Sequence, residues 1–391
     1  MPKPAKRPRR AASKKSRVQH SKISIRDLVA LCDYERAALQ RLSPAARAYI
    51  CSAAGDEISL RWNREAFDRI ALLPRVLTGT RTVDTHVKLF GDTLANPILL
   101  APAAMHRLAH PNGELATAKG AGAEGSALVL STLTTFPVED VVKGATTPVY
   151  LQLYVEPDRG VTKALMQRAE AAGVKAFFVT VDTPVTGPRN VEERARFRRP
   201  PTWILPHCPP QSILGSDGSS TKAHLARMAN YTLDWKDIAW IRAQTRLPVI
   251  LKGVLHPADA TIAVRENVDG IVVSNHGARN LDTVVATLDA LPRVADAIAG
   301  RMPILLDGGI RRGTDILKAI ALGATAVMIC RPYFFGLAVN GADGVASVIN
   351  ILKRELEMAM CLVGCDSIQK LDRSVIWHPN NQLPTKAATK A

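Results

Sequence analysis

The chain has 391 residues, of which 47% are hydrophobic and 22% charged, the composition of a soluble globular protein. No window approaches the roughly 18 consecutive apolar residues of a membrane-spanning helix, which argues against an integral membrane protein. The net charge of +16 would suggest nucleic-acid binding, but most of it lies in one segment: residues 1–26 contain ten Lys or Arg and no acid.

The basic N-terminal segment, residues 1–23, is predicted to be a disordered tail, since it holds too little apolar surface to offset its ordering entropy. It lacks the apolar core of a secretory signal, so we expect a cytoplasmic protein. Targeting to an organelle or the nucleus, or attachment to nucleic acid or an acidic surface, stays open, and the tail's partner is unknown. The six cysteines form no CxxC pair, which indicates free thiols in a reducing compartment and no metal site.

After the tail, the sequence predicts a helical lead-in and then alternating strands and helices. Residues 26–42 and 44–53 are predicted helices. Eight apolar runs follow: PILLA (97–101), ALVLS (127–131), VYLQLY (149–154), AFFVTV (176–181), PVILK (248–252), GIVVS (270–274), PILLD (303–307) and AVMIC (326–330). None alternates cleanly between polar and apolar residues, which is typical of parallel strands buried on both faces.

Eight strand–helix repeats within about 240 residues are what a (β/α)8 TIM barrel requires. We therefore predict this α/β fold for residues 24–370 as one domain, with residues 371–391 as a C-terminal tail. A doubly wound open sheet is the alternative, but no GxGxxG follows the first strand. The interval between the starts of strands 4 and 5 is 72 residues, which predicts a long lid loop over the barrel mouth. A final helix is expected over residues 344–360.

Polar groups follow nearly every predicted strand, at the face where TIM barrels build active sites. Burying an unpaired polar group costs roughly 2–7 kcal/mol, so these groups are expected to converge on a bound polar ligand. Lys252 ends an apolar strand and would be either a Schiff-base nucleophile, as in aldolases, or a fixed cation beside an anionic cofactor. In SNHGARNLD, His276 offers a base near neutral pH and Arg279 a fork for a carboxylate.

The segments after the last two strands are predicted to bind phosphate, because TIM barrels often bind it there. The turn DGGIRRGTD has glycines that allow close backbone approach, and CRP follows the final strand. Arg311 and Arg331 are the candidate phosphate ligands.

Taken together, these segments resemble the FMN-dependent L-2-hydroxy acid oxidising enzymes, the family of glycolate oxidase and lactate oxidase. The likeness extends in one collinear order from about residue 24 to residue 364. It rests on PILLAPAAMHRLAHPNGE, LQLYV, FFVTVDTP followed by Arg189, LKGV, SNHGARNLD, DGGIRRGTDILKAIALGA and the RP of CRP. Motifs of this length in this order are far more specific than a lone glycine pattern.

The resemblance implies a role for each candidate residue. His276 would be the active-site base, Asp182 would stabilise its imidazolium, and Tyr154 would hydrogen-bond the substrate hydroxyl or the developing carbonyl oxygen. The substrate carboxylate would be bound by Tyr49, Arg189 and Arg279. FMN would be bound by Pro102, Ala103, Ala104, Ser131, Gln152, Thr180, Lys252, Ser274, Asp307, Gly309, Arg311, Cys330 and Arg331. Lys252 would then act as the cation near flavin N1, and no Schiff base is needed.

Two departures from the family affect these expectations. Cys330 stands where glycine is usual, so we expect only a weak cofactor contact from it. Leu133 stands where glycolate oxidase has tryptophan and lactate oxidase has tyrosine, so the wall facing the substrate side chain has lost an aromatic ring. The expected substrates therefore include both small and medium 2-hydroxy acids.

The function expected from the resemblance is oxidation of a small or medium L-2-hydroxy acid to the 2-oxo acid, with O₂ reduced to H₂O₂. A dehydrogenase or a lactate-monooxygenase-like outcome is the alternative for the electrons. An aldolase using Lys252, and a basic-tail binding protein with an inactive barrel, are the alternatives from other classes. The resemblance also implies a homotetramer without membrane insertion.

Overall fold

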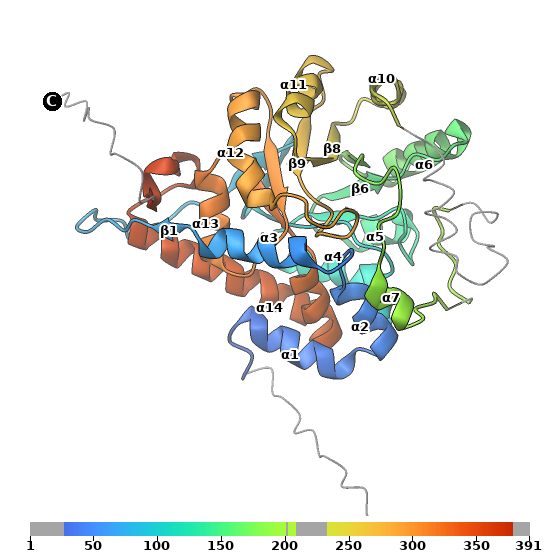
Figure 1. Ribbon diagram of the computed structural model, residues 1–391, viewed down its shortest axis with the longest axis horizontal. Helices are drawn as coiled ribbons and strands as arrows, with labels where there is room; N and C mark the ends of the chain where they lie inside the picture. The colour runs from blue at the N-terminus through green and yellow to red at the C-terminus, as the bar shows by residue number, and fades with distance from the viewer. Residues whose placement is uncertain (1–26, 201, 209–232, 378–391) are drawn as a thin grey trace, which may run out of the picture.

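A closed barrel of eight parallel strands forms the centre of the computed structural model, which describes residues 27–200, 202–208 and 233–377 (Figure 1). The strand order around the barrel is β10-β11-β4-β5-β6-β7-β8-β9. The strands are β4 (Ile98–Leu100), β5 (Leu128–Leu130), β6 (Val149–Leu153), β7 (Phe177–Thr180), β8 (Val249–Val254), β9 (Gly270–Val273), β10 (Ile304–Asp307) and β11 (Ala326–Ile329). Each of the eight predicted runs overlaps one of them, with β8 extending two residues past its run, so the predicted TIM barrel is confirmed.

Helices cover the outside of the barrel, one after each strand except between β7 and β8, where the described part of the chain has two. They are α4 (Gly113–Ala123), α5 (Val138–Gly144), α6 (Arg159–Ala172), α7 (Asn190–Arg194), α10 (Trp235–Gln244), α11 (Pro257–Arg265), α12 (Thr287–Ile298), α13 (Gly313–Ala321) and α14 (Arg331–Val363). Helix α6 ends at Gly173, which has a positive φ of 98°, a conformation that glycine adopts without strain. The lid predicted after strand 4 contains α7 and α10, and part of it, residues 209–232, lies outside the described residues.

The barrel is closed at its N-terminal end, which leaves the opposite end for a ligand. A hairpin of β2 (Val87–Leu89) and β3 (Asp92–Leu94) packs its apolar side chains into the same cluster as the inward-facing barrel residues. In the turn of this hairpin, the Phe90 ring packs edge-on against Tyr150 and Phe178, with centroids 5.8 Å apart in both pairs. Burial of these rings makes this end a packed core.

The N-terminal lead-in is helical, as predicted, but its first helix begins later. It consists of α1 (Leu31–Arg41), α2 (Pro44–Cys51) and α3 (Ile58–Asp68). The backbone before α1 is extended at Ala30, and the Asp33 carboxylate accepts hydrogen bonds from the N–H groups of Val29 and Ala30. These two N–H groups would donate to backbone carbonyls if the helix began earlier. Because Asp33 accepts their hydrogen bonds instead, the helix begins at Leu31 and not at residue 26.

The final helix differs most from the prediction over residues 344–360. Helix α14 begins directly after β11 and contains a break at Asn340 and Gly341, where Gly341 has φ 56°. By length and composition α14 could span a membrane, but half of its most apolar window is buried inside the protein. It packs against α1, α4 and α13, and Leu352 and Leu356 are fully buried, so it serves as a core helix of the barrel domain.

Residues 371–377, which the sequence assigned to a C-terminal tail, belong to the folded body. After η3 (Ile368–Lys370) and η4 (Arg373–Val375), strand β12 (Ile376–Trp377) pairs antiparallel with β1 (Ala71–Leu72). This pairing satisfies backbone groups that a tail would leave to water. A further short element in the described part of the chain is η2 (His106–Leu108). The predicted basic tail, residues 1–23, lies outside the described residues.

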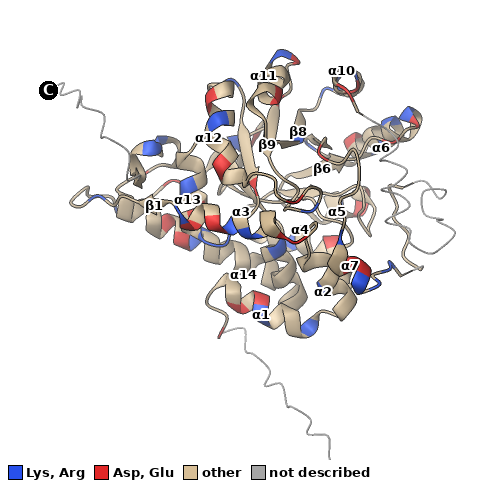
Figure 2. Ribbon diagram, viewed as in Figure 1, with Lys and Arg blue, Asp and Glu red and all other residues tan. Residues whose placement is uncertain are grey.

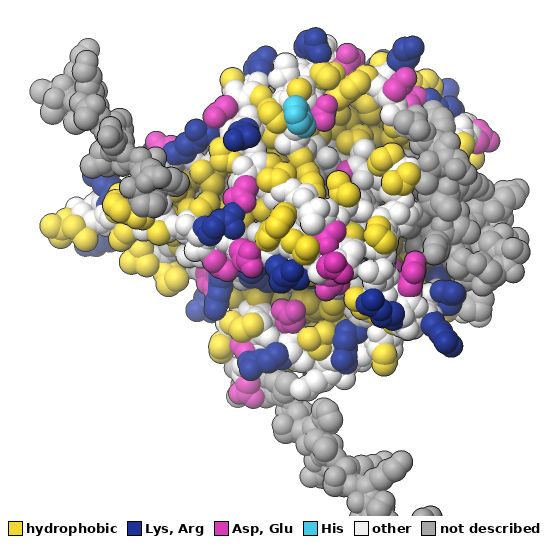
Figure 3. Space-filling model, viewed as in Figure 1, with side chains coloured by type: hydrophobic (Ala, Val, Ile, Leu, Met, Phe, Trp, Pro, Cys, Tyr) yellow, Lys and Arg dark blue, Asp and Glu magenta, His cyan; other side chains and the backbone are white. Residues whose placement is uncertain are grey.

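Charged side chains of both signs are interspersed over the folded body. Figure 2 shows Lys and Arg alternating with Asp and Glu along the helices, and Figure 3 shows the same mixture on the face presented there. A face that binds nucleic acid would instead gather Lys and Arg into one patch or stripe. The face in view has no such patch, whereas the binding-protein alternative depends on the basic tail, which lies outside the described residues.

Candidate active site

The C-terminal ends of the barrel strands surround one large cavity that opens to solvent, and the empty space there, counted together with its open mouth, is about 1240 Å³. All predicted site residues line it except Asp182 and Ser274, which instead hydrogen-bond to lining residues. The residues that line it are Tyr49, Pro102, Ala103, Ala104, Ser131, Leu133, Gln152, Tyr154, Thr180, Arg189, Lys252, His276, Arg279, Asp307, Gly309, Arg311, Cys330 and Arg331. The barrel thus brings the predicted set together in one place.

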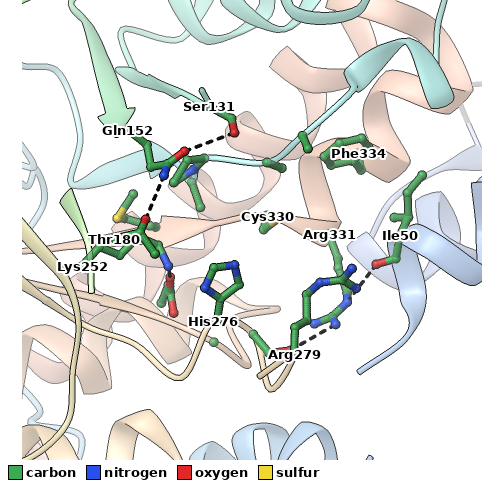
Figure 4. A pocket seen from close by; sticks show the side chains of 18 of the residues that line it. Ile50, Ser131, Gln152, Thr180, Lys252, His276, Arg279, Cys330, Arg331 and Phe334 are labelled. Atoms are coloured by element: carbon green, nitrogen blue, oxygen red, sulfur yellow. Dashed lines mark hydrogen bonds and ion pairs between the residues drawn. The ribbon is translucent and has the colours of Figure 1, made fainter. Parts of the chain in front are cut away.

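His276 lies in the turn after β9 and projects its ring into the cavity (Figure 4). Its backbone has φ 58°, an uncommon conformation that the hydrogen bonds of the turn maintain. The backbone N–H donates to Ser274 Oγ at 3.0 Å, and Asn275 exchanges amide hydrogen bonds of 2.8 and 2.9 Å with Asn63 of α3. Helix α3 therefore fixes the turn that carries the imidazole.

The imidazole pairs with the carboxylate of Asp182, which follows β7. His276 Nδ1 and Asp182 Oδ1 are 2.9 Å apart. Burial lowers the pKa of His276 and Asp182 partly offsets that effect, so the pKa lies below its ordinary value. Burial alone would raise the pKa of Asp182, but His276 and Lys252 outweigh it and the pKa is lowered. The site therefore holds a carboxylate beside a neutral imidazole whose Nε2 is available as a base.

Two guanidinium groups lie beside this pair. Arg279 Nη1 donates to the carbonyl oxygens of Tyr49 and Ser52, at 2.9 and 2.8 Å, and the guanidinium lies 5.1 Å from the centroid of the Tyr49 ring. The same ring stacks on Phe197 of the lid, with centroids 4.6 Å apart. Arg189, 11% exposed, comes from the chain after β7. Both cations face the cavity and suit a carboxylate ligand.

Tyr154 is buried at the end of β6. Burial raises the pKa of its hydroxyl, and the nearby Asp182 carboxylate raises it further. The phenol therefore stays protonated at physiological pH and can donate a hydrogen bond into the cavity.

Lys252, in β8, forms a buried ion pair. Its Nζ lies 3.2 Å from Asp307 Oδ2 and donates to Ser274 Oγ at 3.0 Å. Burial lowers the pKa of Lys252, but Asp307 and Asp182 outweigh it, so the pKa is raised above its ordinary value. A Schiff-base nucleophile needs an uncharged amine, whereas this lysine is a fixed cation. The aldolase alternative is therefore not supported.

Polar side chains from neighbouring strands form a network on the side of the cavity opposite His276. Gln152 Nε2 donates to Thr180 Oγ1 at 3.0 Å, and its Oε1 accepts from Ser131 Oγ at 3.2 Å (Figure 4). The backbone N–H of Thr132 also donates to Gln152 Oε1, at 3.1 Å. These bonds fix the amide orientation of a side chain that is only 2% exposed.

The far end of the cavity carries two arginines that form no ion pair with any described carboxylate. Arg331 donates only to the backbone carbonyls of Ile50, Ser52 and Gly277, and Arg311 Nη1 donates to Ile310 O. Burial and the neighbouring Arg279 lower the pKa of Arg331 to about 10, so it is still a cation at neutral pH. Two partly buried guanidiniums without acids create a strong preference for an anion such as phosphate.

The backbone of Gly309, beside these arginines, packs closely against the backbone of Asn63 in α3. Gly309 has φ 84°, and a Cβ there would lie 2.0 Å from the carbonyl oxygen of Asn63. Cys330, at the end of β11, presents its thiol to the cavity, and burial raises the thiol pKa, so it is uncharged (Figure 4). The cavity wall at Cys330 is therefore neutral, and the positive charge at this end comes from the arginines.

FMN, with its planar ring, hydroxylated chain and terminal phosphate, fits the groups that the cavity leaves unsatisfied. Asp307 Oδ1 is buried and has no hydrogen-bond partner among the described residues, although Oδ2 pairs with Lys252. A hydroxyl of the ribityl chain would supply the missing donor. The two arginines at the far end would take the phosphate charge, and the Gln152 network would meet the polar edge of the ring.

Several residues around the cavity escaped the sequence reasoning. Glu192 on α7 bonds to Arg279, Ser52 at the end of α2 accepts from both Arg279 and Arg331, and Phe197 stacks on Tyr49. Glu192 lies within the charged stretch RNVEERARFRR, which reads as a solvated loop. The carbonyl of Ser52 carries no sequence signal, because any residue supplies one. Other lining residues are Ile50, Ala101, Thr183, Thr186, Gly277, Asn280, Gly308, Ile310, Met328, Ile329, Pro332 and Phe334.

Known proteins with similar sequences and structures point to one family. A family model described as FMN-dependent dehydrogenase matches residues 38–378. An L-lactate oxidase of Nostoc sp. is 45% identical over 361 residues, covering 88% of this chain and 97% of the relative, and glycolate oxidase 1 of Oryza sativa is 41% identical over 360 residues, covering 91% and 98%. A crystal structure of mandelate oxidase with (S)-4-hydroxymandelic acid superposes with a TM-score of 0.83 at 37% identity, covering 88% of this chain and 98% of that one.

Proposed function

The chain belongs to the FMN-dependent dehydrogenase family and is an FMN-dependent 2-hydroxy acid oxidase, and we propose that it acts on small or medium L-2-hydroxy acids with the catalytic residues assigned below. One observation supports the assignment above all others. The imidazole–carboxylate pair of His276 and Asp182 and the guanidiniums of Arg189 and Arg279 line or adjoin the same cavity. Removal of a proton from a bound hydroxy acid requires a base and groups that hold the substrate carboxylate, and here the imidazole and the two guanidiniums supply them in one cavity.

FMN would be held along the cavity from the Gln152 network to the arginines at its far end. Gln152, Ser131 and Thr180 would hydrogen-bond the ring, Asp307 the ribityl chain, and Arg311 and Arg331 the phosphate. Bound FMN supplies the chemistry of accepting the two electrons that leave the substrate's α-carbon. Lys252 holds a positive charge beside this region and is itself fixed by Asp307 and Ser274.

The chain's own side chains bind and orient the substrate and move its proton. Arg279 and Arg189 bind the carboxylate, Tyr49 adds its hydroxyl, and the protonated Tyr154 donates to the substrate hydroxyl oxygen. With Nδ1 engaged by Asp182, His276 accepts a proton at Nε2, and Asp182 stabilises the resulting imidazolium. The proton comes from either the α-carbon or the hydroxyl, and both routes use the same base.

The proposal also includes the electron acceptor, the oligomeric state and the cellular compartment of the enzyme. We propose O₂ as the electron acceptor with H₂O₂ as product, because the relatives compared above are oxidases. A dehydrogenase or monooxygenase outcome would use the same residues on the substrate side. The homotetramer and the cytoplasmic location stay predictions, and one relative, from Arabidopsis thaliana, is named a peroxisomal (S)-2-hydroxyacid oxidase.

Anaerobic mixing of the purified yellow protein with glycolate, lactate, 2-hydroxyoctanoate and mandelate tests the proposal. We expect at least one of these acids to bleach the flavin absorbance, and subsequent admission of O₂ to restore it with formation of H₂O₂. Flavin absorbance that none of the four acids bleaches would contradict the substrate class. Bleaching that O₂ fails to reverse would favour the dehydrogenase alternative.

A further inference from the structure

Glu192 is an acidic residue inside a site that would bind an acid. It lies on the short helix α7, which packs beside α2 at the edge of the cavity (Figure 1). Its side chain is only 13% exposed, so its position differs from the solvated loop that the surrounding charges suggest. A carboxylate so close to a proposed carboxylate-binding site needs a physical reason, because like charges in a partly buried site repel.

One oxygen of Glu192 contacts both arginines that we assign to the substrate. Glu192 Oε1 accepts from Arg279 Nη2 at 2.7 Å and lies 3.6 Å from Arg189 Nη1. The hydroxyl of Ser52 donates to the same oxygen at 3.1 Å. Among the described residues, Glu192 is the carboxylate that pairs with Arg189 and with Arg279, and no second one does.

These contacts fix the plane of the Arg279 guanidinium. Nη1 donates to the carbonyls of Tyr49 and Ser52, and Nη2 donates to Glu192. The guanidinium is thereby kept over the Tyr49 ring, which itself rests on Phe197. Removing Glu192 would leave Nη2 without its anchor, and the side chain could rotate about its remaining contacts.

The charge balance points the same way. Arg189 and Arg279 bring two positive charges close together, and the two charges repel. Burial and Arg279 lower the pKa of Arg189, whereas Glu192 raises it. With Glu192 the three groups carry a net charge of plus one, which a single substrate carboxylate neutralises. Without Glu192, two like charges would face each other whenever substrate is absent.

We infer that Glu192 is a positioning residue, a resident counter-ion that holds Arg279 and Arg189 ready for the carboxylate of a 2-hydroxy acid, an inference that rests on the proposed function. Ser52 supports it by orienting the Glu192 carboxylate. Glu192 does not touch the reacting atoms. Its contribution is to substrate affinity through the two arginines, and hence to KM more than to the rate at saturation.

The test compares Glu192→Ala and Glu192→Gln with the parent protein, each loaded with FMN. Binding of propionate, a carboxylate that lacks the reactive hydroxyl, is measured by the perturbation of the flavin spectrum. We expect Glu192→Ala to raise the Kd for propionate and the KM for the best 2-hydroxy acid about tenfold each, with the rate of flavin reduction at saturation changed less than threefold. Glu192→Gln, which keeps an acceptor oxygen but loses the charge, should fall between Ala and the parent.

Controls separate positioning from a general loss of structure. Glu65→Gln removes an exposed charge from α3 and should change neither Kd nor KM. Ser52→Ala should weaken propionate binding in the same direction as Glu192→Ala but less, and its effect should largely vanish in the double variant. Flavin content and melting temperature close to those of the parent confirm folding.

The inference is overturned if Glu192→Ala binds propionate as tightly as the parent or more tightly, which would make Glu192 a bystander or a competitor of the substrate. Failure of the proposed function looks different. In that case no 2-hydroxy acid bleaches the flavin of the parent protein, whereas propionate titrations of the two variants still report on the arginines.

Discussion

His276 and Asp182 are joined by a 2.9 Å hydrogen bond although they follow different strands, β9 and β7. The bond assigns the Nδ1 proton to the carboxylate side and leaves Nε2 to face the cavity. The second oxygen, Asp182 Oδ2, is buried without a hydrogen-bond partner among the described residues. An incompletely satisfied carboxylate gains from a positive charge nearby, so the pair favours protonation of His276 during the reaction.

The acid limb of the pH profile reports on this pair. Because the pKa of His276 lies below its ordinary value of 6.5, the neutral base is present above that pKa, and kcat/KM should fall as pH drops through it. Asp182 raises the pKa of His276, so Asp182→Asn should move the limb to lower pH and slow flavin reduction at neutral pH by about 100-fold or more. Stopped-flow reduction across pH measures both effects. A limb that moves to higher pH in Asp182→Asn would contradict this assignment.

Lys252→Met tests the buried cation, because methionine has a similar length but no charge. The change leaves Asp307 buried without its cationic partner, and breaking such a pair costs roughly 3–5 kcal/mol. We expect FMN affinity to fall at least tenfold and the flavin midpoint potential to drop, since the reduced anion loses a stabilising charge. Flavin content, fluorescence titration and spectroelectrochemistry measure these effects. Lys163→Met, at an exposed lysine of α6, is the control, and equal flavin affinity in both variants would argue against the role.

The barrel strands and most of the site could be predicted because both are local in sequence. Each strand is a continuous apolar run, and in a TIM barrel every polar residue that follows such a run must lie at the same rim. Thus His276 and Arg311 could be assigned to one cavity without knowing any distance between them. The start of α14 could not be predicted, since CRP reads equally well as a turn and as a helix start with Pro332 in its first turn.

The contacts that orient the cavity residues could not be predicted, because they depend on tertiary packing. The carbonyls at the end of α2 receive hydrogen bonds from Arg279 and Arg331 only because α2 packs across the barrel mouth. Glu192 approaches Arg279 because the chain after β7 returns toward the turn after β9. In sequence these partners are separated by 87 residues, and nothing in their local composition relates them.

Leu133→Trp tests the wall that faces the substrate side chain. Leu133 is 4% exposed, lines the cavity and packs in a cluster with Tyr154, Phe197 and Leu205. An indole there narrows the cavity, so kcat/KM for 2-hydroxyoctanoate should fall relative to that for glycolate by about tenfold or more. Steady-state assays with both acids measure the ratio. Leu362→Trp, at an exposed position of α14, is the control. An unchanged ratio in Leu133→Trp would show that the side chain of the substrate does not lie against residue 133.

Gly253→Ala tests whether the backbone of β8 holds Asp182 in place. Gly253 has φ 117°, and a Cβ there would lie 2.5 Å from Asp182 Cβ, so alanine must both adopt a strained conformation and displace the carboxylate. We expect flavin reduction to slow at least tenfold and the melting temperature to fall. Gly144→Ala, which has neither a positive φ nor a heavy atom within 4 Å of the added Cβ, is the matched control. Flavin reduction in Gly253→Ala as fast as in Gly144→Ala would show that the position of Asp182 beside Gly253 is not needed for its action on His276.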